Sequence, residues 1–167
     1  MKRFGVIFLF LVPITLGLVA CSNVSEEEKP NITVTLNISN LTNDEFNDVG
    51  AKSLEDTNKD DFKNIQFTLE VEHSNMIKNR EIVCPSIKEI LYSKNKERYW
   101  FGEGNSQDNK GENFAKYNEK IVFYSDGLDE NDIREIFKGE KVKVSWTKSK
   151  GEKKEESINL VDTVEFK

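Results

Sequence analysis

The sequence predicts an all-β protein, an antiparallel sandwich closed at one end by a short helix. Residues 31–39 and 65–72 alternate strictly between apolar and polar side chains, which is the period-two pattern of a half-buried strand. Several shorter apolar runs follow, separated by turn-forming residues. No alternation of long helices and strands and no internal repeat occurs. Many short strands with few helices are typical of sandwiches and small barrels.

The remaining strands are expected where short apolar or β-branched runs occur. Residues 121–124 are apolar on both faces, as in a central strand, and residues 142–146 alternate again. The runs at 82–84, 87–92, 98–101 and 158–166 are shorter and less regular. Two polar segments rich in Asn, Asp and Gly are expected to be loops, at 40–61 and 102–113.

One helix is predicted over residues 129–138. Asp129 is a favourable N-cap, Leu128 and Ile133 have the spacing of a hydrophobic staple, and Gly139 suits the turn beyond the last residue. A short helix between two late strands resembles the connection between strands E and F of immunoglobulin-like sandwiches. The resemblance implies an immunoglobulin-like fold, although the Cys–Trp–Cys pattern of antibody domains is missing. A small open barrel is the alternative.

The N-terminus carries the signature of an export signal. Lys2 and Arg3 precede an almost wholly apolar run over 4–20, and the polar pair Ser22-Asn23 follows Cys21. The four residues Leu18-Val19-Ala20-Cys21 resemble the lipobox of bacterial lipoproteins, Leu-x-[Ala/Gly]-Cys. The resemblance covers residues 1–21 only. It implies a signal helix removed after residue 20, a diacylglyceryl group on the Cys21 sulfur, and a location on the outer face of the cell membrane. An uncleaved membrane helix is the alternative.

The chain is therefore expected to have three parts. Residues 1–20 form the lipoprotein signal peptide, residues 21–30 an acidic flexible tether, and residues 31–167 one β-sandwich domain. Removal of the signal peptide leaves a net charge of about −8. That sign argues against a nucleic-acid partner and against flat adhesion to anionic lipids.

No recognisable catalytic set occurs, so an enzyme is not expected. Cys84 lacks a neighbouring base in the sequence and is interpreted as a small buried residue. The single histidine, His73, occupies a position on the apolar face of its strand. One histidine and one free cysteine do not build a zinc site. No nucleotide-binding loop is present, since Gly102-x-Gly104 lacks a third glycine. No cofactor is expected.

Two segments carry candidate binding chemistry. Asp56 to Asp61 alternates oxygen-bearing side chains like the start of a calcium loop, but Asp61 replaces the glycine and Phe67 the bidentate glutamate. The segment is therefore interpreted as a solvated acidic loop, with calcium binding left open. The aromatic run Tyr99-Trp100-Phe101 is either core or a stacking platform. Simple alternation puts Tyr99 and Phe101 on one side and Trp100 on the other.

The expected function is binding of a protein or another envelope component by the membrane-anchored sandwich, through its edge strands or its loops. The alternative is an accessory envelope hydrolase or a small-ligand capture protein, which uses carboxylates or the run Tyr99–Phe101. That alternative requires a concave pocket with converging polar groups.

Overall fold

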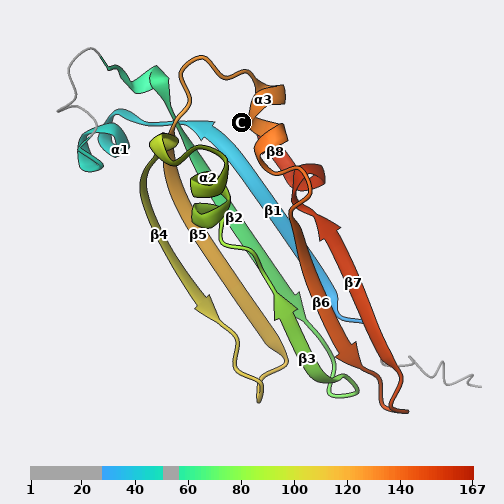
Figure 1. The fold of residues 1–167 in the computed structure, drawn as a ribbon. Helices are drawn as coiled ribbons and strands as arrows, with labels where there is room; N and C mark the ends of the chain where they lie inside the picture. The colour runs from blue at the N-terminus through green and yellow to red at the C-terminus, as the bar shows by residue number, and fades with distance from the viewer. Residues whose placement is uncertain (1–27, 51–56) are drawn as a thin grey trace, which may run out of the picture.

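The computed structural model describes residues 28–50 and 57–167 (Figure 1). These residues are mostly β-structure, with short helices at the connections. In chain order the elements are β1 (Asn31–Asn40), α1 (Asn43–Asp48), the 3-10 helix η2 (Lys59–Asp61), β2 (Phe62–Glu72), β3 (Lys78–Val83), α2 (Ile87–Asn95), the 3-10 helix η3 (Lys96–Arg98), β4 (Tyr99–Gln107), β5 (Phe114–Tyr124), α3 (Glu130–Ile136), β6 (Lys141–Thr147), β7 (Lys153–Asn159), the 3-10 helix η4 (Leu160–Thr163) and β8 (Val164–Phe166).

The eight strands of the described residues form two sheets. One sheet has the order β4-β5-β2-β1-β8, and the other has the order β3-β6-β7. All neighbours are antiparallel except β1 and β8, which pair in parallel from Leu36 to Ile38. The all-β class is therefore confirmed, with one parallel pair that the sequence pattern did not predict.

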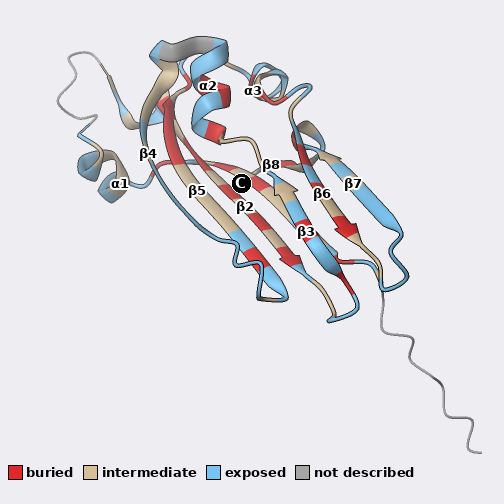
Figure 2. Cartoon of the chain, turned by 60° about the horizontal axis from the view of Figure 1, so that its bottom comes forward, coloured by how far each residue is buried: buried red, intermediate tan, exposed pale blue. Residues whose placement is uncertain are grey.

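The core lies between the sheets and beneath the helices. The alternating residues of β2 that face inward, Ile65, Phe67, Leu69 and Val71, are fully buried. They belong to one cluster with residues of β6, α2 and α3 (Figure 2). Period-two alternation fixes this register, because a shift by one residue would expose every one of these side chains. The alternating residues of β6 that join the cluster are Val142, Val144 and Trp146.

A second, smaller cluster lies on the opposite face of the five-stranded sheet. Leu41, Phe62 and Val122 are buried there, and Phe46 of α1 packs against them. Helix α1 is held by a capping box in which Thr42 accepts from the Glu45 N–H. The described part of the segment 40–61 therefore contains a helix and the 3-10 helix η2, where a long loop was expected.

The predicted helix at 129–138 is confirmed as α3, although it ends two residues earlier, at Ile136. The Asp129 side chain accepts a hydrogen bond from the Asp132 N–H at 2.8 Å, and Ile133 is fully buried. Phe137 is the C-cap, and Gly139 has a φ of +87°, a conformation that favours glycine. The local signals thus place this helix correctly.

Two further expectations are wrong. Residues 87–92 were expected to be a strand and form helix α2, because Ile87, Ile90 and Leu91 share one buried helical face at spacings of three and four. Residues 102–113 were expected to be a loop, yet β4 continues to Gln107 and pairs with β5. Backbone pairing with β5 forms this edge strand although its side chains are mostly exposed (Figure 2).

Candidate functional site

A hollow of about 400 Å³ lies between the start of α2 and the inward face of β4 and β5. Strand β4 is the edge of its sheet, and no other described strand pairs with its free side. The residues of β4 opposite the inward positions of β5 are small: Gly102, Gly104 and Ser106. This sequence of small residues leaves the inward face of the edge strand without bulky side chains, and the hollow occupies that space.

The two glycines of β4 leave little room for a side chain. A Cβ atom at Gly102 would lie 3.0 Å from the Tyr99 hydroxyl, and one at Gly104 would lie 3.0 Å from the Asn118 carbonyl oxygen and 3.1 Å from the Cγ of Glu119. The side chains of Tyr99 and Glu119 therefore lie across the glycines. Lys88 of α2 completes the wall, with its ammonium 5.2 Å from the centre of the Tyr99 ring.

Glu119 is the most unusual polar group of the hollow. It stands at an inward position of β5, and burial raises the pKa of its carboxyl above the ordinary 4.5. Its oxygen Oε2 accepts long hydrogen bonds from the Ser86 hydroxyl and the Lys88 backbone N–H, both at 3.4 Å. The carboxylate also accepts a hydrogen bond from the Ile87 backbone N–H at the start of α2. No described lysine or arginine forms an ion pair with it. A half-buried carboxylate that forms no ion pair suits a ligand that brings a positive charge or a further hydrogen-bond donor.

Replacement of Glu119 by glutamine is expected to raise stability at pH 7. A folded-state pKa above the unfolded value means that stability falls as pH rises from below 4.5 through the folded-state pKa. The penalty therefore grows as pH rises above 4.5, and the uncharged amide removes it. Urea unfolding at pH 7 and at about pH 3.5 measures the difference, which should vanish at the acidic pH. Glu103→Gln, on the outward face of β4, is the control. A Glu119→Gln variant that is less stable at pH 7 would contradict this account.

Cys84 lies close to this hollow but is unsuited to nucleophilic chemistry. Burial, reinforced by the negative charge of Glu119, raises the pKa of the Cys84 thiol to about 12. The thiolate is the reactive form of cysteine, and it is therefore scarce at neutral pH. The sequence interpretation of Cys84 as a small packed residue agrees with its contact with the main core.

The aromatic run is divided between two faces of the sheet, but not as simple alternation predicted. Tyr99 pairs with Phe123, an inward residue, whereas Phe101 pairs with Val122, an outward one, because the register shifts at Trp100. Trp100 packs against the second cluster, that of Leu41, Phe62 and Val122, which we call the outward cluster. Its Nε1 donates a hydrogen bond to the Val49 carbonyl at 2.8 Å. Only Tyr99 reaches the hollow, so the three rings do not form one stacking platform.

The acidic segment at 56–61 uses its oxygens locally. Asp56 lies outside the described residues. The Asn58 side chain accepts from the Asp60 N–H at 2.9 Å, and the Asp61 carboxylate accepts from the Asn58 N–H at 2.7 Å. These two bonds form the capping box of η2. Among the residues that the structure describes, no group of three or more His, Cys, Asp or Glu side chains is placed to hold a metal ion.

His73 belongs to a network around the buried Arg80, whose side chain is 4% exposed. The guanidinium donates to Asp108 at 2.6 Å, to the Glu112 carbonyl at 3.1 Å and to His73 Nε2 at 3.0 Å. Since the His73 Nδ1 lies 2.8 Å from the Ser74 carbonyl, a neutral imidazole protonated at Nδ1 satisfies both contacts. Asp108 also accepts from the Tyr117 hydroxyl at 2.8 Å. The network ties the β4–β5 turn to β3.

The predicted lipid attachment residue, Cys21, lies outside the described residues. Within the described part of the chain, no helix has both the length and the apolar character needed to cross a membrane. Comparison of the chain with protein-family models, with curated proteins and with solved structures gives no significant match.

Proposed function

We propose that this chain is a bacterial lipoprotein, tethered by a lipid on Cys21, whose extracytoplasmic sandwich binds an extended segment of another envelope protein. The observation that carries the binding proposal is the hollow on edge strand β4. An extended segment can add to a free edge through backbone hydrogen bonds and gain specificity from a pocket beside that edge. Glu119, which forms no ion pair with any described residue, would receive a charged donor group from the segment.

The strand order supports an immunoglobulin-like fold for this domain. In the constant type, strands A, B, E and D form one sheet and strands C, F and G form the other. Numbered along the chain, β1, β2, β5 and β4 are neighbours in one sheet, and β3, β6 and β7 form the second. Helix α3 then lies in the E–F connection, and β8 adds a short parallel strand beside the first strand.

The anchor is tested by replacing its cysteine. Cys21→Ser is expected to release the domain from the membrane fraction or to leave an unprocessed precursor, because the sulfur that receives the lipid is gone. Cell fractionation and the intact mass of the protein measure this. The control is Cys84→Ser, which leaves the proposed lipidation site intact. A Cys21→Ser protein that stays in the membrane at its fully processed size would contradict the lipid anchor.

The binding proposal is tested by crosslinking in intact cells, followed by recovery of the lipid-anchored chain. Wild-type protein should recover one partner repeatedly, and Glu119→Gln should reduce that recovery about tenfold, as expected when a charged hydrogen bond is lost. Glu155→Gln, on the exposed strand β7, is the matched control and should leave recovery unchanged. Equal recovery with Glu119→Gln and wild type would exclude Glu119 from the binding surface.

A second candidate is capture of a small envelope ligand, or its hydrolysis, in the same hollow. The raised pKa of Glu119 favours it, because a half-buried carboxyl that is easier to protonate can exchange a proton with a ligand. Thermal-shift screening of the purified chain with small polar ligands tests this candidate. Stabilisation that Glu119→Gln abolishes would support it, and an unchanged melting temperature with every ligand would count against it.

A further inference from the structure

We infer that the end of the domain where the N-terminal segment enters docks on anionic lipid headgroups and holds the domain upright on the membrane. The inference rests on the lipid anchor proposed above. This second membrane contact is made by side chains of the folded domain rather than by Cys21. Three observations carry it: the distribution of charge along the domain, a hollow among unpaired lysines, and the position of the first described residues.

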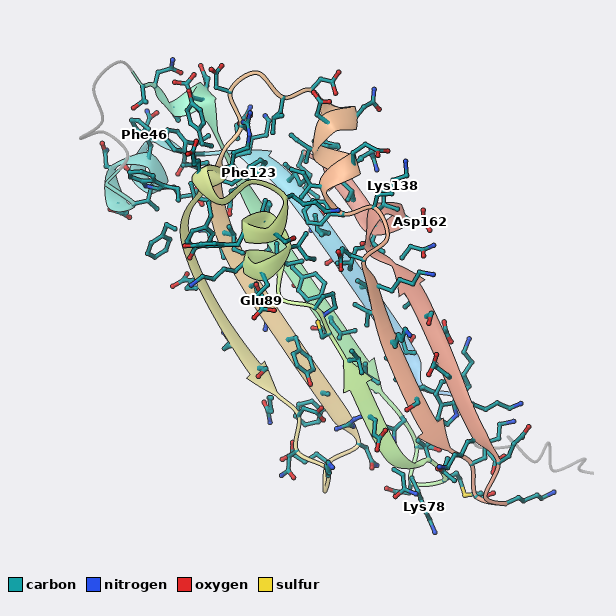
Figure 3. All side chains as sticks on the ribbon, in the orientation of Figure 1. Phe46, Lys78, Glu89, Phe123, Lys138 and Asp162 are labelled. Carbon is teal, nitrogen blue, oxygen red and sulfur yellow. The ribbon has the colours of Figure 1, made fainter. Side chains whose placement is uncertain are left out.

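Charge is segregated along the long axis of the sandwich. The β2–β3, β4–β5 and β6–β7 turns lie at one end, which we call the basic end, and α1, η2 and α3 lie at the other (Figure 1). In Figure 3, Lys78 is at the basic end, far from Phe46, Lys138 and Asp162. The far end is rich in acids: Asp44, Glu45, Asp48, Asp60, Asp61, Asp126, Asp129, Glu130 and Asp132. These acidic side chains lie far from the three turns of the basic end (Figure 1).

A hollow of about 400 Å³ opens among the side chains of the basic end. Its lysines come from β3, the β4–β5 turn and β7. Four lysines of this end are exposed and form no ion pair with any described residue: Lys78, Lys110, Lys150 and Lys153. Three of them, all except Lys150, line the hollow. A cluster of unpaired ammonium groups around a concavity suits an anionic group such as a phosphate.

The basic end also carries acids, and Glu72, Glu81 and Glu155 form no ion pair with any described residue, whereas others have partners. Asp108 is bound to Arg80, and Glu152 is paired with both Lys148 and Lys154. Glu81 and Glu112 also line the hollow, and Glu112 accepts a hydrogen bond from the Gln107 amide at 3.2 Å. In the lining of the hollow itself, five basic side chains stand against these two acids.

The first described residues are fixed to this same end. The Trp146 indole N–H donates to the Glu28 carbonyl at 3.1 Å, the Glu28 carboxylate accepts from Ser149, and Lys29 pairs with Glu156 at 3.0 Å. Six residues lie between Cys21 and Glu28, and the seven steps from one Cα atom to the next span at most about 25 Å. The basic end is therefore the part of the domain that an anchor at Cys21 holds nearest to the lipid.

Electrostatics then decides the orientation of the tethered domain. Screening limits the attraction to about 8 Å at physiological salt, a distance that the short tether allows the basic end to reach. One lysine near an anionic surface shifts the docking equilibrium about fivefold, so three lysines together contribute on the order of a hundredfold. The acidic far end is repelled by the same surface. Both effects favour a domain that stands on its basic end with α1 and α3 away from the membrane.

The experiment uses energy transfer from tryptophan to a dansyl lipid. The chain has two tryptophans, and Trp100→Phe leaves Trp146, at the basic end, as the only donor. The lipidated full chain with this substitution is reconstituted into vesicles of phosphatidylcholine, either alone or with about a third of phosphatidylglycerol. Transfer should be higher on the anionic vesicles and should fall to the neutral level in about 0.5 M salt.

The lysines are tested by a matched pair of triple variants. Lys78→Gln, Lys110→Gln and Lys153→Gln together should lower transfer on anionic vesicles to the neutral level. Lys59→Gln, Lys138→Gln and Lys141→Gln remove the same charge away from the basic end and should leave the high transfer unchanged. Equal transfer on both kinds of vesicle, or an unaffected first variant, would overturn the docking inference. A chain whose mass shows no lipid and that does not float with either vesicle would instead refute the anchor.

Discussion

Replacement of Arg80 by methionine is expected to destabilise the folded protein by about 2 kcal/mol, because it removes the buried guanidinium that donates a charged hydrogen bond to Asp108. The Arg80 side chain is 4% exposed, and its guanidinium lies 2.6 Å from Asp108. Methionine fills a similar length but donates no hydrogen bond. Asp108, the Glu112 carbonyl and His73 Nε2 would all lose their shared donor. Urea unfolding followed by tryptophan fluorescence measures the loss at pH 7.

The pH dependence of stability shows whether the loss in Arg80→Met comes from the ion pair with Asp108. Burial alone would raise the pKa of Asp108, but the Arg80 guanidinium and the Tyr117 hydroxyl outweigh it and lower that pKa. A lowered folded-state pKa contributes stability above the unfolded value of 3.8, and this stability is lost as pH falls through the folded-state pKa. Arg80→Met should therefore lose less stability than wild type between pH 7 and about pH 3. Adding Asp108→Asn should recover part of the deficit. An Arg80→Met protein within about 1 kcal/mol of wild type would refute this account.

Replacement of Trp100 by alanine is expected to cost about 3 kcal/mol, the size of effect seen when a large aromatic side chain leaves a packed cluster. The Trp100 ring meets Phe62 edge-on with centroids 6.0 Å apart, and its indole N–H binds the Val49 carbonyl. Its loss would leave a void beside Phe62 and would free the chain after α1. Phe46 of α1 would keep its contact with Phe62, so α1 would be held less firmly but not released.

The neighbouring Phe101 supplies the control for Trp100. It is 44% exposed and belongs to neither buried cluster, so Phe101→Ala should cost less than about 1 kcal/mol. Thermal and urea unfolding of both variants measure the contrast. Similar losses for the two variants would mean that the register shift at Trp100 does not divide the run as described.

The sequence pattern predicts the strands that bury one face and leave the other in water. In β2 the buried Phe67 and Leu69 alternate with half-buried polar residues, which is the pattern that period-two analysis detects. Helix α3 can be predicted from the sequence equally well, because Asp129 and Gly139 mark its two ends. Helix α2 is missed because a short apolar run with β-branched residues fits a strand and a helix alike, and tertiary packing decides between them.

The candidate site is missed for a different physical reason. Strand β4 is held by backbone bonds to β5 and has little apolar surface, so its glycines and polar residues resemble a loop. Gly102 and Gly104 were considered only as a phosphate-binding loop. Together with Ser106 they place a small residue at every second position, which indicates an edge strand without bulky side chains on one face. Glu119 has no such signal, since its inward position and its partners depend on how α2 folds over β5.

The central claim is that β4 is the binding edge of a lipid-anchored domain, and a photocrosslinking amino acid tests it most directly. It is placed at Ser106, which lines the hollow on β4, and, in a separate chain, at the exposed Ser157 on β7, the edge of the other sheet. Irradiation of intact cells should join one partner to the chain modified at 106 and none to the chain modified at 157. Crosslinks of equal yield from both positions, or from position 157 alone, would contradict the assignment of β4 as the binding edge.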